Sequence, residues 1–146
     1  MTKYVAFIGP PGSGKTTQIM MLRSVLGASQ VLIASVPRLM RGEPDLMALL
    51  TTDEHMELNK HLNAAHRAKE AGVLAPIQLD ELLFKSIGRA SVPLVAMDGC
   101  PRGAEPARAY LKTALPIHTH VVHLTFAPEQ VHLSLARQYS REVEKR

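Results

Sequence analysis

The sequence predicts an α/β fold in which helices cover a parallel β-sheet. Four short apolar runs, at residues 3–8, 30–34, 92–97 and 120–126, have the length and composition of strands. The segments between them carry helical signals, which gives the order β–α–β–α–α–β–α–β, and such alternation is typical of a parallel sheet. The length of 146 residues and the hydrophobic fraction of 46% suit a single domain over residues 1–146.

The helical segments can be located in order along the chain. The first follows the glycine-rich segment after residue 8, and its apolar positions include Ile19, Met20 and Leu22. The clearest helix spans 51–72, where Thr51 and Glu54 have the spacing of a capping box and Gly72 suits the C′ position. Its expected apolar stripe contains Met56, Leu62 and Ala65.

Two further helices follow. One begins after Pro76 and ends at Gly88, and the last begins at Pro128 and continues through Arg137 and Arg141. A simple crossover between the second and third strands needs one helix, yet the sequence predicts two. We therefore expect residues 36–76 to form a small helical subdomain beside the sheet.

Composition limits the classes of partner. The net charge is +4 and the pI is near 9.5, but the arginines are dispersed and aromatic residues make up only 4%, which argues against nucleic acid as the main partner. No apolar run is long enough to span a membrane, and the N-terminus lacks a signal-peptide pattern. The single cysteine, Cys100, fits a reducing compartment. We expect a cytoplasmic, monomeric protein that binds neither nucleic acid nor membranes.

Residues 9–16, with the sequence GPPGSGKT, predict a phosphate-binding loop. The pattern G-x-x-x-x-G-K-[ST] lets successive backbone N–H groups turn inward around an anion, and the following helix adds its positive N-terminal end. Lys15 would reach the β- and γ-phosphates of ATP, and the hydroxyl of Thr16 would ligate Mg²⁺. Motor, switch and transporter ATPases use the same loop, so the loop predicts what is bound and not what is done to it.

A second motif follows the third apolar run, which ends in MDGCPRG. An aspartate at the carboxyl end of a strand beside the loop can hold Mg²⁺ through water, and Asp98 is placed to do so. Arg102 can grip a phosphate with two parallel hydrogen bonds. Taken alone, Asp98 would equally suit a turn, and Arg102 would suit a solvated surface position.

Together these motifs resemble those of the nucleoside-monophosphate kinases, and most closely adenylate kinase. The family's GxPGxGKGTQ resembles residues 9–18, its DGFPR resembles 98–102, its STGDLLR resembles 35–41, its GxLVP resembles 72–76 and its RxxxR resembles 137–141. The resemblance covers essentially the whole chain. It implies a P-loop three-layer α/β/α fold with strand order 2-3-1-4, and it makes residues 36–76 the acceptor-binding subdomain.

The resemblance also implies a reaction, in which the γ-phosphoryl group of ATP passes to a nucleoside monophosphate, with AMP as the first expectation. It assigns catalysis to Lys15, Arg102 and Arg141, and Mg²⁺ to Thr16 and Asp98. The resemblance assigns ATP binding to Gly9, Pro11, Gly12, Ser13, Gly14, Lys15, Thr16, Thr17, Arg137 and Arg141. It assigns binding of the monophosphate to Ser35, Val36, Arg41, Ala75, Gly99 and Arg102.

The sequence departs from the family in ways that bear on the acceptor base. Pro37 and Arg38 replace a Gly-Asp pair, Cys100 replaces a phenylalanine, and the glutamine expected after the second motif has no match near Glu105. The family's chains continue beyond the second lid arginine, with a lid and a fifth strand. A second possible function is therefore a domain that binds ATP without efficient phosphoryl transfer. A third possible function is a kinase whose acceptor is a small molecule other than a nucleotide. The pairing of Arg41 with Arg102 argues against that third function.

Overall fold

The computed structural model describes residues 1–126 and 130–144. Its elements are, in chain order, β1 (Lys3–Ile8), α1 (Lys15–Leu26), β2 (Val31–Ala34), α2 (Val36–Met40), α3 (Pro44–Met47), α4 (Thr52–Glu70), α5 (Ile77–Ile87), β3 (Leu94–Asp98), α6 (Ala104–Leu111), the 3₁₀ helix η1 (Leu115–His118), β4 (Thr119–His123) and α7 (Val131–Glu144). No helix within these ranges combines the length and apolar character that a membrane span requires.

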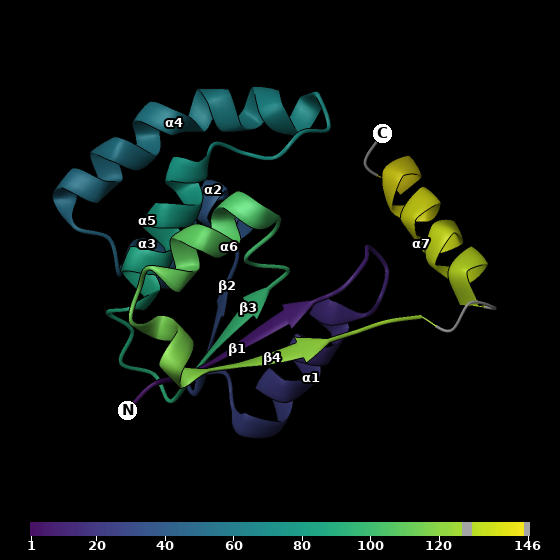
Figure 1. The fold of residues 1–146 in the computed structure, drawn as a ribbon, viewed down its shortest axis with the longest axis horizontal. Helices are drawn as coiled ribbons and strands as arrows, with labels where there is room; N and C mark the ends of the chain where they lie inside the picture. The colour runs from purple at the N-terminus through teal and green to yellow at the C-terminus, as the bar shows by residue number, and fades with distance from the viewer. Residues whose placement is uncertain (127–129, 145–146) are drawn as a thin grey trace.

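Among the described residues, four parallel strands form one sheet in the order β2-β3-β1-β4, which confirms the predicted fold class and strand order. Alternate side chains of β1 point to opposite faces of this sheet. Tyr4 and Ala6 join the larger core, with residues of α2, α4, α5 and α6, whereas Phe7 joins Ile19 of α1 in a smaller core. Helix α1 thus covers one face of the sheet, and α5 and α6 lie on the other (Figure 1).

The strands begin and end close to their predicted bounds, except at β4. The sequence predicts a strand over 120–126, but the ladder runs from Thr119 to His123. Strand β1 is the neighbour of β4 and ends at Ile8, whose carbonyl accepts a last hydrogen bond from Leu124 N at 2.8 Å. The ladder between β1 and β4 ends there, and residues 124–126 are not part of the strand.

Residues 36–76 contain α2, α3 and α4, and α4 lies along the outer side of the molecule (Figure 1). The buried residues Leu39, Leu46 and Leu58 of these helices belong to the same core cluster as Leu32 and Met97 of the sheet. The helical segment is therefore packed onto the sheet layer through shared apolar contacts. The predicted start of the last helix, Pro128, lies outside the described residues.

The capping box predicted at the start of α4 is present. The Thr51 hydroxyl accepts a hydrogen bond from Glu54 N at 3.3 Å, and Glu54 Oε1 accepts one from Thr51 N at 2.9 Å. The predicted apolar stripe is confirmed at Ala65 and Leu62, which belong to or pack against the core, and is wrong at Met56, which is 67% exposed because Leu58 faces the core in its place. This register turns Glu54 inward, so that it is only 4% exposed.

A charged partner compensates for the burial of Glu54. Arg89, which follows α5, donates to Glu54 Oε1 and also to Leu49 O, at 3.1 Å from Nε and 2.8 Å from Nη2. Lys85 Nζ lies 3.9 Å from Glu54 Oε2. Burial alone would raise the pKa of Glu54, but the hydrogen bonds from Thr51 and Arg89 outweigh it and leave this pKa below its ordinary value of 4.5. These contacts join the start of α4 to the end of α5.

We expect the substitution Glu54→Ala to lower the free energy of unfolding by about 3 kcal/mol at neutral pH, since it removes a cap and leaves Arg89 without its partner. Because the folded-state pKa is depressed, this stabilisation is present above the ordinary pKa and is lost as the pH falls through the folded value. Denaturant unfolding at neutral pH, and again at a pH below the folded-state pKa of Glu54, measures this loss of stability. The exposed Glu57→Ala on the same helix is the control, and it should change stability by less than about 0.5 kcal/mol. Equal losses in the two variants would contradict the role of Glu54.

Candidate functional site

The glycine-rich loop, residues 9–16, connects β1 to α1. A Cβ atom at Gly9 would lie 2.4 Å from Leu124 O, so no larger residue fits there without displacing backbone. Gly12 and Gly14 have φ values of 77° and 90°, in the region that favours glycine. The loop turns tightly enough that Ser13 N donates to Pro10 O at 3.2 Å. The backbone N–H groups at the start of α1 are therefore presented at the carboxyl edge of the sheet, an arrangement suited to an anion.

Lys15, the first residue of α1, folds back across this loop. Its Nζ donates to Gly9 O at 2.8 Å and to Pro10 O at 3.0 Å. Burial lowers the pKa of Lys15 below its ordinary value of 10.5. Asp98 opposes that shift, while Arg102 and Arg141 add to it. The lysine thus lies within electrostatic reach of two further cations, and an anion bound there would relieve their mutual repulsion.

The register of the sheet brings the second sequence motif to this loop. Asp98 ends β3 opposite Phe7 of β1, and Gly99 N donates to Phe7 O at 2.9 Å. Asp98 Oδ2 accepts a hydrogen bond from the hydroxyl of Thr16 at 2.8 Å, in a solvent-exposed position. The structure therefore brings together the two oxygen ligands that the sequence predicts for a magnesium ion.

A cavity of about 510 Å³ opens beside these residues, within the size range of small-ligand sites. Predicted monophosphate-binding residues that line it are Val36, Arg41, Ala75, Gly99 and Arg102, together with Asp98. Ser35 does not line it: this side chain is buried and caps α2, where it accepts a hydrogen bond from Arg38 N at 3.2 Å. The cavity thus combines two guanidinium groups with the carboxylate next to the loop.

The arginines predicted to contact ATP lie on α7. Arg137 Nη1 donates to Gly12 O at 3.2 Å, which brings the helix to the outer side of the loop. Arg141 is near enough to Lys15 to lower its pKa. Both arginines are exposed. The other predicted loop residues, Pro11 and Thr17, are exposed as well, at the bend of the loop and in the first turn of α1.

Other residues that line the cavity were not predicted as binding residues, although Pro37 and Cys100 were linked to the acceptor base as departures from the family pattern. They are Pro37, Met40, Ala65, His66, Lys69, Gly72, Val73, Leu74, Asp80, Cys100 and Pro106. The spacing of His66 and Lys69 on α4 places them on one helix face, but only the packing of α4 directs that face toward the cavity. For Asp80 the signal is an acidic residue within the apolar run of α5. Cys100 is 3% exposed, and burial raises the pKa of its thiol to about 12, so it is a protonated wall residue.

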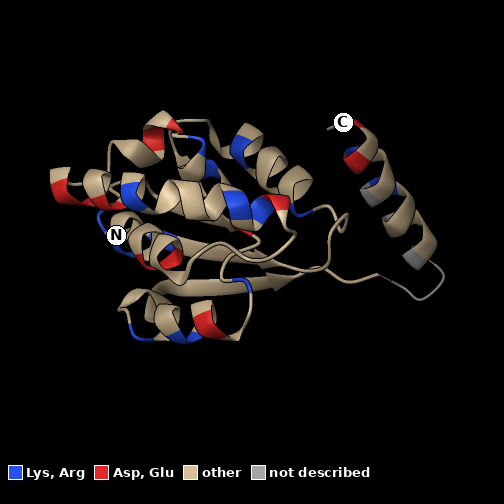
Figure 2. Cartoon of the chain, turned by 90° about the horizontal axis from the view of Figure 1, so that it is seen from above, with Lys and Arg blue, Asp and Glu red and all other residues tan. Residues whose placement is uncertain are grey.

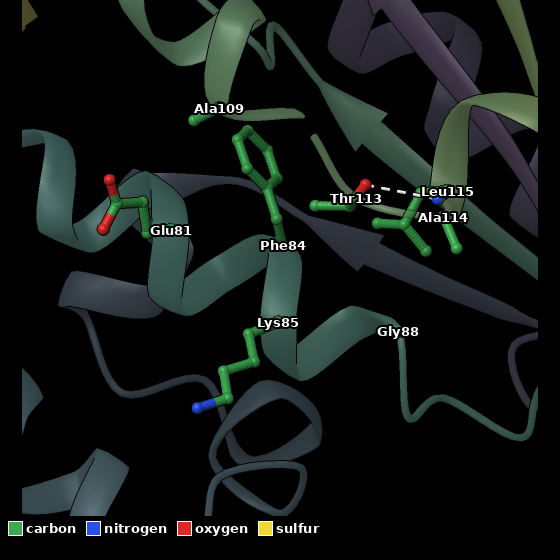
Figure 3. A pocket seen from close by; sticks show the side chains of 8 residues that line it. All are labelled: Glu81, Phe84, Lys85, Gly88, Ala109, Thr113, Ala114 and Leu115. Atoms are coloured by element: carbon green, nitrogen blue, oxygen red, sulfur yellow. Dashed lines mark hydrogen bonds between the residues drawn. The ribbon is translucent and has the colours of Figure 1, made fainter. Parts of the chain in front are cut away.

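Charge elsewhere on the molecule is mixed. Figure 2 shows basic and acidic positions interspersed along several helices. A smaller hollow of about 370 Å³ lies against a different face of α5, where Phe84 points toward Ala109 of α6 and the head groups of Glu81 and Lys85 point away from it (Figure 3). Its charged side chains are those of Glu81 and Lys85, at the exposed edge. This hollow therefore offers a ligand fewer charged side chains than the cavity beside the loop does.

No protein-family model matches the chain, and no curated protein is significantly similar to it.

Proposed function

We propose that the protein is a nucleoside-monophosphate kinase that transfers the γ-phosphoryl group of ATP to a monophosphate acceptor, with AMP as the leading candidate. The observation that carries the proposal is the close approach of the cavity lining to Lys15 of the glycine-rich loop. Gly99 and Arg102 line the cavity, while a Cβ at Gly99 would be 3.5 Å from Lys15 Cε of the loop. Phosphates bound at the loop and at Arg102 would therefore meet near Lys15.

In this proposal the P-loop, residues 9–16, holds the β- and γ-phosphates through backbone N–H groups, and Lys15 exchanges its bonds to Gly9 O and Pro10 O for phosphate oxygens. Arg41 and Arg102 grip the acceptor phosphate, while Arg141 neutralises charge on the transferred group. Phosphoryl transfer depends mainly on positioning and on charge neutralisation, which a site rich in cations supplies.

Thr16 and Asp98 would hold Mg²⁺. A hydroxyl and a carboxylate within hydrogen-bond distance of each other suit this ion, which takes oxygen ligands and usually binds through one or two protein groups plus phosphate and water. When bound, the ion neutralises charge on the phosphates. The strand register that fixes Asp98 beside the loop would hold this pair in place.

A coupled assay for ADP formation with AMP, CMP, UMP and GMP as acceptors tests the proposal. We expect Mg²⁺-dependent turnover with at least one of them, at a rate well above ATP hydrolysis without an acceptor. The alternative is a domain that binds ATP without transfer, and the solvent exposure of the Thr16–Asp98 pair favours it, since transfer needs water to be excluded. ATP binding in calorimetry without turnover on any acceptor would support that alternative against the kinase.

A further inference from the structure

Asp80 is an acidic residue in the cavity that the proposed transfer reaction does not use. It lies on the first turn of α5, and it is only 7% exposed. A phosphate would be repelled by its carboxylate, so Asp80 does not belong to the anion-binding part of the cavity. The other carboxylate in the lining, Asp98, already has a partner in Thr16.

Asp80 has no ion-pair partner among the described residues, 1–126 and 130–144. Burial raises the pKa of Asp80 to about 6. Glu81 and Glu105 act in the same direction, against its own backbone amide and Arg102. The nearby thiol of Cys100 is protonated. A buried carboxyl group of this kind, directed into a cavity, needs a hydrogen-bond donor, and a ligand can supply one.

The apolar lining of the same cavity suits the flat face of a nucleobase. It is contributed by Val36, Met40, Leu74, Ala75 and Pro106. These residues offer no side-chain hydrogen bonds to the edge of a base. Asp80 therefore supplies a polar group that can distinguish one base from another, while Arg41 and Arg102 contact the phosphate that all acceptors share.

We propose that Asp80 selects the acceptor base by accepting a hydrogen bond from its exocyclic amino group, so that the site takes AMP and CMP in preference to IMP and UMP. The inference rests on the proposed function, because it assumes that the cavity binds a nucleoside monophosphate. Adenine and cytosine carry an amino group beside an unprotonated ring nitrogen, whereas hypoxanthine and uracil carry a carbonyl beside a ring N–H. A carboxylate oxygen accepts from the amino group and repels the carbonyl.

The preference belongs to the ionised form of Asp80, in which both carboxylate oxygens only accept hydrogen bonds. A neutral carboxylic acid presents an O–H donor beside a carbonyl acceptor, so it can pair with the amino edge of adenine or cytosine and equally with the carbonyl and ring N–H of hypoxanthine or uracil. Because burial raises the pKa of Asp80 to about 6, the comparison is made well above that pH.

The test compares kcat/KM, and the Kd from calorimetry, within two matched pairs, AMP against IMP and CMP against UMP. We expect the chain to favour the amino member of each pair by about 10- to 100-fold, the effect of one hydrogen bond to a charged group. The isosteric Asp80→Asn places an amide donor at the same position, and should lower this preference through improved binding of IMP and UMP. Asp80→Leu should bring the two members of each pair toward equal affinity.

Glu81→Gln is the matched control. It removes the next carboxylate along α5, which is exposed and lines the hollow of Figure 3 rather than the cavity. We expect the preference to stay at its original value in this variant. Thermal unfolding of each variant shows whether α5 remains folded, and a general loss of structure would lower both members of a pair together without changing their ratio.

Two results would overturn the inference while leaving the proposed function intact. One is that the unmodified chain binds and phosphorylates amino and oxo acceptors equally well. The other is that Asp80→Asn keeps the original preference. If no monophosphate binds or is phosphorylated, the proposed function itself fails, and the inference fails with it.

Discussion

Replacing Lys15 with methionine is expected to lower kcat by at least about 10²–10³-fold, the loss that follows removal of one preorganised charge donor from a transition state. The ammonium group lies against the carbonyls of Gly9 and Pro10, at distances of 2.8 and 3.0 Å, and is the cation that the loop carries into the site. Methionine preserves the length of the side chain but cannot neutralise phosphate. Steady-state ADP formation gives kcat, and calorimetry gives the accompanying loss of ATP affinity.

Lys60→Met serves as the control for the loss of one positive charge, because Lys60 is an exposed residue of α4 that does not line the cavity. This variant should retain the original kcat and ATP affinity. Retention of the original kcat by Lys15→Met would contradict the assignment of the loop as the donor site, whatever its effect on stability.

Replacing Arg102 with alanine is expected to raise the KM for the monophosphate by about 10- to 100-fold while the KM for ATP stays within a few-fold of its original value. This range corresponds to a hydrogen bond between charged groups. Arg102 lines the cavity, and Gly99, which turns the chain toward it, has a φ of 64° that favours glycine. The planar guanidinium can hold two phosphate oxygens at once, so Arg102→Lys should recover only part of the affinity.

Arg108→Ala is the matched control on α6, since Arg108 is exposed and lies outside the cavity lining. Initial rates measured with each substrate varied in turn separate the two KM values. Equal increases in both values for Arg102→Ala would show that this arginine acts on the whole site rather than on the acceptor phosphate.

Local patterns were sufficient to predict the sheet and the position of Asp98 beside the glycine-rich loop. Strand alternation, the glycine spacing of residues 9–16 and the aspartate after the third strand all follow from short segments of sequence. In a parallel sheet the carboxyl ends of adjacent strands share one edge, so Thr16 and Asp98 could be expected together, and they lie 2.8 Å apart. The capping box at Thr51 is likewise a signal within four residues.

Features that depend on distant segments could not be predicted in this way. Arg89 pairs with Glu54 from 35 positions along the chain, and nothing in either neighbourhood indicates the pairing. The end of β4 is set by the end of β1, not by the apolar residues that follow His123. Asp80 alone suggests a solvated helix position, and only the packing of α2 and α4 beside α5 makes it part of a cavity.

The ion pair between Glu54 and Arg89 also bears on the cavity beside the loop. It fixes the beginning of α4, whereas His66 and Lys69 near the other end form part of the cavity rim. With a rise of 1.5 Å per residue, Glu54 and His66 are about 18 Å apart along the helix axis. Ala65, next to His66, is buried in the core, so α4 is held at both ends, and the ion pair and the core packing together keep His66 and Lys69 in place beside the cavity.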